Sequence, residues 1–407
     1  MRKILAIALL GLVAPSNAQF YWEQRADLPT TGLWGPSFFT IGDKGYVVSG
    51  RTSGLDVTNV WMYDPVLDTW ATRAPIPAPR RYGAGFSING KGYVACGIDG
   101  GDHLNDLWEY DPVADSWTQR ADFPGTPRYG THYFALNGLG YVGGGNTGSA
   151  TGPYVSDMFA YDPLTDQWSF MADLPGLARY GTSTITASGR AFVFGGLMSD
   201  QQHTGDIYEY DPQAGSWTLR PPIPGATRTY AMALSYSWDG VIAAGKSGAG
   251  VNVYDGFRYL PGSNGWTAIP DYPGEAGWVG ATMAISGRSF GGLGSILTAG
   301  TDHNDWWELV KDGVGVVEQV AASSPLLEVA PNPVVPGEMI RLKGPAATTG
   351  SRISFFSMDG RSVHATQLNS SKAFVCPILA EGTYLIRVVD PQGTTMTARL
   401  LIASARP

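Results

Sequence analysis

Four arginines recur along this chain at intervals of about 50 residues, each shortly after a proline. Three are followed directly by a tyrosine, and the fourth has a tyrosine one place later. A guanidinium group holds a carboxylate through two parallel hydrogen bonds, and flat aromatic rings offer stacking area to sugars or side chains. The predicted ligand-binding residues are Arg81, Arg128, Arg179, Arg228, Tyr82, Tyr129, Tyr180 and Tyr230, with Trp34 and Trp278 at the matching positions of the first and last periods.

A purely structural role is the alternative for these arginines. Each guanidinium could pair with an aspartate in a neighbouring linker and only hold repeats together, because repeated positions usually serve the repeat. The two interpretations place the same side chains in different surroundings, one at a surface and one in an ion pair.

Catalysis would need an acid or a base beside the arginines. Glu275, in the last linker, and His132, shortly after Arg128, are the candidates. His103, His203 and His303 fall in loops spread over different repeats, which is too far apart to bind one metal ion. Asp99, Asp102 and Asp106 share one loop and could hold Ca²⁺, although such aspartates more often hydrogen-bond turn backbones. We predict no metal and no cofactor.

A repeated tryptophan reveals the elements that must position these residues. Trp22, Trp70, Trp117, Trp168, Trp217 and Trp266 are separated by 48, 47, 51, 49 and 49 residues. A tyrosine lies seven residues before five of them, and four of these continue as Tyr-Asp-Pro, a turn-forming sequence. A period near 50 residues predicts four-stranded propeller blades.

Each period is predicted to form strands a to d, with a short a–b turn, a long b–c loop and an Asp-Pro c–d turn. Because successive strands are antiparallel, the d–a linkers and b–c loops share one face, and the short turns share the other. The arginines therefore lie at the tunnel mouth on the face that carries the long loops. Binding residues belong on loops that a rigid scaffold holds.

The two ends of the repeat set the predicted number of blades. After Trp266 the chain supplies strands a, b and c at 278–285, 288–293 and 306–310, but no further tryptophan follows. Phe20-Tyr21-Trp22-Glu23 is a strand d without partners of its own. Pairing it with the last three strands leaves no open sheet edge. We predict an all-β fold, a six-bladed propeller over residues 19–310 closed by the N-terminal strand.

These residues resemble the kelch family of propellers. The glycine pair Gly144-Gly145, the Tyr-Asp-Pro turn, the spaced tryptophans and the Pro-x-x-x-Arg linker carry the likeness. Leu33 and Gly277 depart from it by replacing the arginine, and Leu260 replaces the aspartate of the turn. The resemblance implies that arginines at this position bind acidic ligands, and that some six-bladed members isomerise acidic sugars. A copper site of the galactose-oxidase type is poorly supported, because Cys96 lies within a strand.

The N-terminus has the pattern of a signal peptide over residues 1–18. Arg2 and Lys3 precede an apolar run from Ile4 to Val13, and Ser16-Asn17-Ala18 supplies small residues at the cut. Ten apolar residues are too few to span a bilayer, and no other segment qualifies. The net charge of −8 argues against nucleic acid as a partner. We therefore predict secretion, with the chain extracellular or attached to the cell surface, and two free, buried cysteines, Cys96 and Cys376.

A different pattern follows a linker predicted at 311–326. Alternating strands at 339–342, 353–356, 384–389 and 397–402 predict a small β-sandwich over 327–407. Ala330-Pro331-Asn332-Pro333, Ser357-Met358-Asp359-Gly360-Arg361 and Glu381-Gly382-Thr383-Tyr384-Leu385 resemble the C-terminal sorting domain of the type IX secretion pathway of Bacteroidota. The resemblance implies an export signal that the type IX machinery reads. An adhesive immunoglobulin-like module is the alternative.

Three functions fit these features. The favoured one is a secreted binding protein that recognises a glycan or protein ligand on the face of the linkers and long loops. The second is a carbohydrate-active enzyme such as an acidic-sugar mutarotase or epimerase. The third is a structural surface or matrix protein. A catalytic group beside an arginine in a deep pocket would favour the enzyme, whereas a mouth plugged by aromatic rings would favour protein binding or structure.

Overall fold

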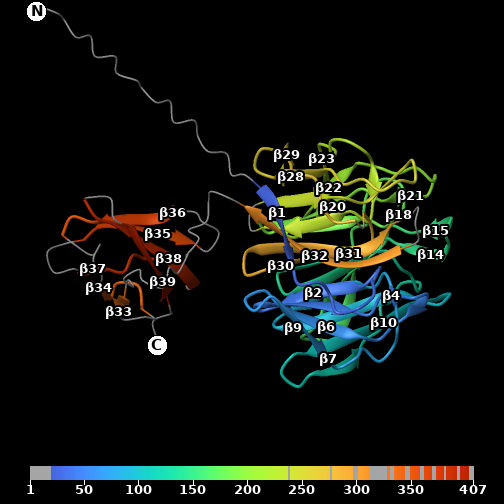
Figure 1. Cartoon of the computed structure of the whole chain (residues 1–407), viewed down its shortest axis with the longest axis horizontal. Helices are drawn as coiled ribbons and strands as arrows, with labels where there is room; N and C mark the ends of the chain where they lie inside the picture. Colours follow the sequence, from blue (N-terminus) through green and yellow to red (C-terminus); the bar gives the residue numbers. More distant parts are fainter. Residues whose placement is uncertain are drawn as a thin grey trace, which may run out of the picture. The chain divides into compact units, whose positions relative to one another are not determined.

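The computed structural model of this protein divides into two compact units, Met1–Asp312 and Gly313–Pro407. It describes residues 20–236, 239–275, 277–296, 301–311, 328–330, 334–343, 349–357, 362–368, 373–379, 382–391 and 395–402. All regular elements in these ranges are β-strands, which confirms the prediction of an all-β chain (Figure 1). No helix capable of crossing a membrane occurs in the described ranges.

The first unit contains six four-stranded antiparallel sheets, which we call blades 1 to 6. Blade 1 consists of β2 (Ser37–Ile41), β3 (Lys44–Val48), β6 (Val60–Asp64) and β7 (Thr69–Arg73), and blade 2 of β8 (Ala84–Ile88), β9 (Lys91–Asp99), β10 (Asp102–Asp111) and β11 (Ser116–Arg120). Blade 3 consists of β12 (His132–Leu136), β13 (Leu139–Gly143), β16 (Met158–Asp162) and β17 (Gln167–Met171), and blade 4 of β19 (Ser183–Ala187), β20 (Arg190–Phe194), β22 (Ile207–Asp211) and β23 (Ser216–Arg220).

Blade 5 consists of β25 (Met232–Ser235), β26 (Gly240–Ala243), β28 (Gly256–Leu260) and β29 (Gly265–Ile269). Blade 6 joins β30 (Ala281–Ile285), β31 (Arg288–Ile296) and β32 (Thr301–Lys311) to the N-terminal strand β1 (Phe20–Arg25). β1 pairs antiparallel with β32, with Phe20 opposite Lys311 and Arg25 opposite Trp306. The spare N-terminal strand therefore pairs with the strand to which the sequence assigned it.

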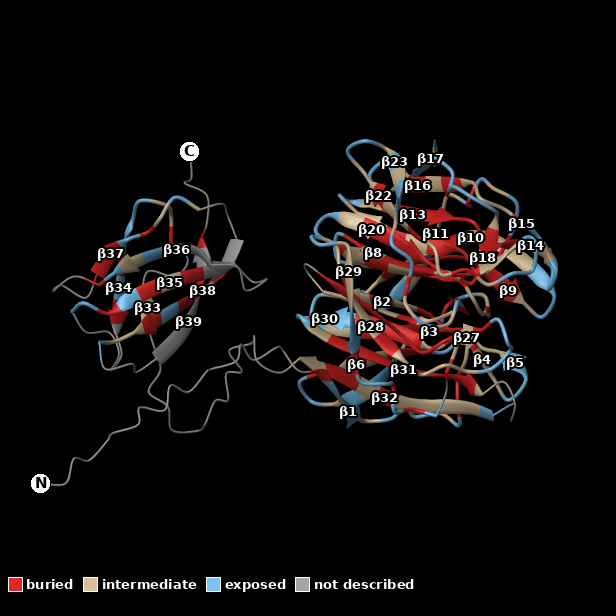
Figure 2. Cartoon of the chain, turned by 90° about the horizontal axis from the view of Figure 1, so that it is seen from above, coloured by how far each residue is buried: buried red, intermediate tan, exposed pale blue. Residues whose placement is uncertain are grey.

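The first strand of each blade, strand a, contacts the first strand of the next. These contacts run from β2 to β8, β12, β19, β25 and β30, and β30 contacts β2. Buried residues follow the strands of the sheets, while turns are exposed (Figure 2). Apolar clusters form between adjacent blades, as where Phe86 and Tyr93 of blade 2 meet Val142 and Tyr161 of blade 3. Burial between sheets thus holds the unit together.

Each repeated tryptophan binds the linker that leaves strand d of the preceding blade. Its indole N–H donates to a backbone carbonyl of that linker, over 2.8 to 3.3 Å. The acceptors are Pro270, Ala26, Ala74, Ala121, Ala172 and Pro221, for Trp22, Trp70, Trp117, Trp168, Trp217 and Trp266 respectively. The ring fills the seam between blades while its polar edge is satisfied.

A second repeated link uses the carboxylate just before strand d. Asp115 Oδ1 accepts from the Tyr110 hydroxyl at 2.6 Å and from the backbone N–H of Ala74 at 2.9 Å. Asp68 and Asp166 make the same two bonds in blades 1 and 3. All three have left-handed φ angles between 48° and 53°. Blade 4 carries Gly215 there, and the Tyr210 hydroxyl has no hydrogen-bond partner in the described ranges.

Four short hairpins or bridges extend the loops of the same unit. They are β4 (Arg51–Thr52) with β5 (Leu55–Asp56), β14 (Asn146–Ser149) with β15 (Gly152–Tyr154), β18 (Arg179–Tyr180) with β21 (Leu197–Met198), and β24 (Arg228–Thr229) with β27 (Lys246–Ser247). All four involve d–a linkers or b–c loops. This face, which we call the loop face, therefore carries more ordered backbone than the turn face opposite.

The second unit contains two antiparallel sheets. One consists of β33 (Glu328–Ala330), β34 (Met339–Lys343) and β37 (Ala373–Val375), and the other of β36 (Ser362–Gln367), β35 (Arg352–Ser357), β38 (Gly382–Val389) and β39 (Thr395–Ile402). Side chains of both sheets, among them Ile340, Phe355 and Ile386, share one core. Four of these strands were predicted, and β37 coincides with the strand-like apolar run that ends at Cys376. β33 and β36 were missed because they are short or polar.

Several predictions fall outside the described residues. These are the signal peptide at 1–18, most of the linker at 311–326, and the motif residues Pro331-Asn332-Pro333, Met358 to Arg361 and Glu381. Cys96 and Cys376 are both free and buried, as predicted.

Candidate functional site

The linker arginines lie inside their blades rather than on the loop face. Arg128 is 1% exposed and makes a bidentate ion pair with Asp157, at 2.5 and 2.9 Å. Its Nε donates to the Thr126 carbonyl and its Nη1 to the Gly144 carbonyl. Arg228 pairs with Asp255 at 2.9 Å, and Arg179 lies 3.7 Å from Asp206. Each of these guanidinium groups is therefore paired with a carboxylate of its own blade.

In blade 2 the residue equivalent to Arg128 is Arg80, whereas the proline spacing aligns Arg81 with Arg128. Arg80 is fully buried and holds Asp106 through two bonds of 2.7 Å. The linker from Pro77 to Arg80 is one residue shorter than the linker from Pro124 to Arg128, so counting from the proline shifts the alignment by one residue. Arg81 instead pairs with Ile98 in the position that Tyr129 takes opposite Asn146.

The partner carboxylates were not identified from the sequence. Asp157, Asp206 and Asp255 each stand just before strand c, and Asp106 lies within β10 immediately before Leu107. All four pair with an arginine of the same blade. Their recurrence with the tryptophan period was the available signal. The alternative interpretation, in which each arginine pairs with an aspartate, agrees with these ion pairs. The pairing, however, occurs within a blade and not between neighbouring linkers.

Two tyrosines close the centre of the loop face. Each blade places one residue with left-handed φ at the start of its inner strand, and blades 1, 3 and 4 use glycine there: Gly35, Gly130 and Gly181. Tyr82 and Tyr230 take this position in blades 2 and 5, with φ of 57° and 50°. Their rings stack with centroids 5.1 Å apart. A strained backbone at two tyrosines therefore puts aromatic rings across the channel.

Backbone hydrogen bonds connect these positions from blade to blade. The N–H of Tyr82 donates to the Gly35 carbonyl at 2.7 Å, and that of Tyr230 donates to the Gly181 carbonyl at 2.7 Å. Gly130 bonds to Tyr82, Gly181 bonds to Gly130, and Gly35 bonds to the carbonyl of Val279 in blade 6. The two tyrosines thus sit on a chain of bonds that involves all six blades.

Further aromatic side chains surround the pair. Tyr129 lies 5.7 Å from Tyr82 and 5.9 Å from Tyr180, between ring centroids. Trp34 lies 5.5 Å from Tyr82, and Trp278 lies 6.1 Å from Tyr230. We call Trp34, Tyr82, Tyr129, Tyr180, Tyr230 and Trp278 the aromatic lid. All six predicted aromatic residues therefore belong to one cluster, each of them only partly buried.

Cationic side chains flank the lid on two sides. Arg81 and Arg51 both pair with Asp56, and both guanidinium groups lie within 6 Å of the Trp34 ring, at 5.7 and 5.9 Å. On the other side, the Lys246 ammonium lies 5.4 Å from the Trp278 ring. The cations at the edge of the lid therefore stabilise its rings by cation–π attraction.

His132 is buried between blades 3 and 4. It is 1% exposed, and its ring meets Trp217 edge-on with centroids 6.2 Å apart. Neither ring nitrogen has a hydrogen-bond partner in the described ranges. Burial and the nearby charges of Arg179 and Arg128 lower its pKa to about 3, so the imidazole is neutral at pH 7. A cavity lies between the inner strands of the six blades, and we call it the central cavity. His132 does not line it, although its neighbours Thr131 and Tyr133 do.

Glu275 lies on the loop face with its side chain 77% exposed, and its Oε2 is 3.6 Å from His303 Nδ1. It too is absent from the wall of the central cavity. Blade 6 lacks the linker arginine, and there the Tyr272 hydroxyl and the Trp307 indole donate to Asp305 instead, at 3.1 and 2.7 Å. Neither catalytic candidate lines the central cavity, although His132 lies near the charges of Arg128 and Arg179.

The described residues contain no group of three His, Cys, Asp or Glu side chains arranged to hold a metal ion. Of the three aspartates considered for Ca²⁺, Asp106 is committed to Arg80. Asp99 and Asp102 face each other across the β9–β10 hairpin.

Comparison with known proteins identifies the repeat. The KLHDC2/KLHL20/DRC7 Kelch-repeats domain matches residues 35–174, and the Kelch motif matches residues 178–224. Among solved structures, "Structure of YjhT" is similar with a TM-score of 0.60 and 17% identity, over 69% of this chain and 95% of that one. No curated protein matches significantly. Blades 1 to 4 therefore contain kelch repeats, and the first unit has the fold of a kelch propeller.

Proposed function

We propose that this chain is an exported binding protein that recognises a protein ligand through the aromatic lid and the loops around it. One observation carries the proposal: the buried arginines belong to the blades, while all six predicted aromatic residues gather at the centre of the loop face. Aromatic side chains dominate the energetics of protein interfaces because they bury large areas at small entropic cost.

A protein is favoured over a glycan for two reasons. Kelch propellers generally bind proteins. In addition, the lid rings pack on one another and on Arg81, Arg51 and Lys246. A cluster of aromatic and cationic groups at a patch centre is the composition typical of interface hot spots.

The proposal is tested by site-specific photocrosslinking. A photoreactive amino acid would replace Trp34 or Trp278 in the lid, and Val113 or Leu164 on the turn face as matched controls. The controls are 95% and 87% exposed, so they are more accessible to an adventitious partner than the partly buried lid positions are. We expect discrete protein adducts from the lid positions alone.

Two outcomes would redirect the proposal. Equal crosslinking from both faces would favour a structural matrix protein, which packs without a dedicated surface. Binding on a glycan array that Trp34→Ala and Trp278→Ala abolish would make the ligand a glycan. An acidic-sugar isomerase is not supported, because Glu275 is exposed and His132 is buried away from the cavity.

The export step rests on the sequence patterns at both ends. We propose that residues 1–18 are removed on secretion and that the second unit is read by the type IX machinery. The mass of the secreted chain tests this: an N-terminus at Gln19 is expected. A reporter fused to residues 313–407 should leave a type IX-competent cell but remain inside a strain that lacks the pathway.

A further inference from the structure

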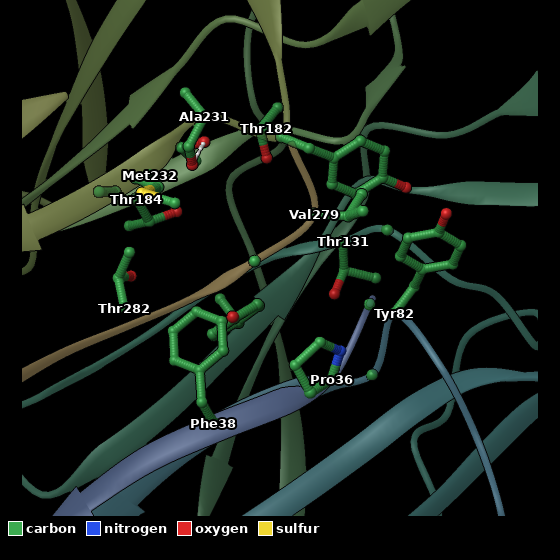
Figure 3. Close-up of a pocket in the computed structure, with 18 of the residues that line it drawn as sticks. Pro36, Phe38, Tyr82, Thr131, Thr182, Thr184, Ala231, Met232, Val279 and Thr282 are labelled. Atoms are coloured by element: carbon green, nitrogen blue, oxygen red, sulfur yellow. Dashed lines mark hydrogen bonds between the residues drawn. The ribbon is translucent and has the colours of Figure 1, made fainter. Parts of the chain in front are cut away.

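A cavity of about 180 Å³ lies between the six inner strands, on the far side of the aromatic lid from the loops (Figure 3). Tyr82, Tyr230 and Val279 bound its loop-face end. Ser235 and Ala284 line it near the ends of their strands, and Ala284 is exposed. The cavity is therefore closed toward the loop face and reached from the turn face.

Its wall is polar but carries no charge. None of the lining residues is acidic or basic, and hydroxyl groups come from five of the six blades or their linkers. The hydroxyl-bearing residues are Tyr82, Thr131, Tyr133, Thr182, Ser183, Thr184, Tyr230, Ser235 and Thr282. A carboxylate or ammonium group placed here would lose its hydration without gaining an opposite charge. The wall thus selects a neutral, hydrogen-bonding ligand.

Three of these hydroxyl groups are buried without a hydrogen-bond partner in the described ranges. They are Thr131 Oγ1, Thr182 Oγ1 and Tyr230 Oη. Thr131 is only 4% exposed, and Thr131 and Thr182 line the cavity (Figure 3). Buried hydroxyls are almost always satisfied in native proteins. Each of the three oxygens is covered by neighbouring protein atoms, so a rotation of its side chain toward the cavity would bring it within reach of an occupant that supplies donors and acceptors.

Aromatic rings and size narrow the occupant further. Phe38 and Tyr133 line the cavity with ring centroids 6.1 Å apart, so the wall offers apolar faces as well as hydroxyls. A cavity of about 150 Å³ holds a benzene ring. We propose that this cavity binds one neutral, polyhydroxylated six-membered ring, a pyranose sugar or a cyclitol, that enters from the turn face. This site is reached from the face opposite the proposed protein-binding surface, with which it shares only Tyr82 and Tyr230.

The proposal is tested by ligand-observed NMR and calorimetry on the full chain. The probes are glucose, galactose, mannose and myo-inositol, with glucuronate and glucosamine as charged counterparts of matched size. We expect at least one neutral ring to bind, and its charged counterpart to bind at least about tenfold more weakly. Methyl glycosides and short oligosaccharides with the same terminal ring distinguish a free sugar from the end of a glycan.

Variants locate the binding. Thr131→Val removes one unpartnered hydroxyl with little change of shape, and Ala233→Phe fills the cavity. We expect the first to weaken binding several-fold and the second to abolish it. Thr118→Val makes the same chemical change at an exposed position on β11 and should have no effect. Trp34→Ala should also leave sugar binding unchanged, which separates this site from the loop face.

Three results would overturn the proposal. One is that no neutral ring binds up to its solubility limit. Another is that binding persists in Ala233→Phe while melting shows that variant to be folded. The third is a crystal soaked in the best probe that shows only ordered water in the cavity, because the three hydroxyls would then be satisfied by solvent.

Discussion

At the scale of single residues, the linker arginines act as internal cross-links of their blades. Each guanidinium holds the start of strand c against the linker that enters the blade, through a carboxylate and backbone carbonyls. Removing one partner of such a buried pair is costly mainly because it leaves the other charge buried and unpaired. Stability is therefore the property that these residues control.

Replacement of Arg128 tests this role. We expect Arg128→Ala to lower the free energy of unfolding by about 3 kcal/mol, because Asp157 and the Gly144 carbonyl lose their donor. Denaturant unfolding measures the loss. Asp157→Ala should cost less when Arg128 is already absent, so a double-mutant cycle should give a clear coupling. If Arg128→Ala is as stable as the unmodified protein, the structural role is wrong, and Arg128 is again a candidate ligand-binding residue.

His132 makes stability depend on pH. Its folded pKa of about 3 lies below the unfolded value near 6.5, so the unfolded chain binds the extra proton between these values. Stability is full above about pH 6.5 and falls as the pH drops, by about 2 kcal/mol at pH 5 from this residue alone. His132→Leu should flatten that part of the stability profile. Parallel profiles for the two proteins would show that His132 is not kept neutral.

At the scale of elements, the seams between blades repeat one arrangement with local exceptions. The tryptophan and the carboxylate before strand d both bind the linker that leaves the preceding blade, and the tyrosine hydroxyl donates to that carboxylate. Blade 4 has Gly215 in place of that carboxylate, with φ of 60° and open space where a Cβ would be. The backbone is thus already in the conformation that Asp68, Asp115 and Asp166 adopt.

Gly215→Asp should therefore stabilise the protein. The new carboxylate would accept from the Tyr210 hydroxyl, and from the Ala172 N–H as its counterparts do, which we expect to add about 1 kcal/mol. Thermal and denaturant unfolding measure the gain. Repeating the change in a Tyr210→Phe background supplies the control, in which most of the gain should disappear. A loss of stability in both backgrounds would contradict the arrangement.

The sequence predicted the positions of the strands well, but it predicted the directions of their side chains less well. The tryptophan period located the strands, because each blade repeats the same pattern of burial and turns. It did not show that the linker of blade 2 is one residue short, since Arg80 and Arg81 are adjacent and either fits the pattern. Nor did it show that Tyr82 and Tyr230 occupy positions with left-handed φ, where blades 1, 3 and 4 use glycine. Side-chain direction depends on such single-residue shifts.

At the scale of the whole molecule, the first unit depends on a pairing between its two ends. β1 occupies the outer edge of blade 6, and its Trp22 fills the seam to blade 5 through the Pro270 carbonyl. Without β1, the edge of β32 would be open, and an unpaired edge is a site of aggregation.

Deletion of residues 20–25 should therefore destabilise the whole unit and promote association, as measured by denaturant unfolding and size-exclusion chromatography. A permuted chain is the matched control. Phe20 lies opposite Lys311, so a copy of an Asp-Pro turn joining Lys311 to Phe20 would supply β1 after β32. The permuted unit should fold. Normal stability after the deletion alone would show that β1 is dispensable.

The same pairing sets an order in time. β1 is the first described strand of the unit to be synthesised, yet its partner β32 is made only after the strands of five blades. Such distant contacts form slowly, and their loop entropy has to be overcome before they contribute. Until then the chain exposes both a free strand and an unfinished sheet. Under the export that we propose above, the machinery would have to shield the chain until its last blade is complete, and we expect the meeting of the two ends of this unit to be the slow step of its biogenesis.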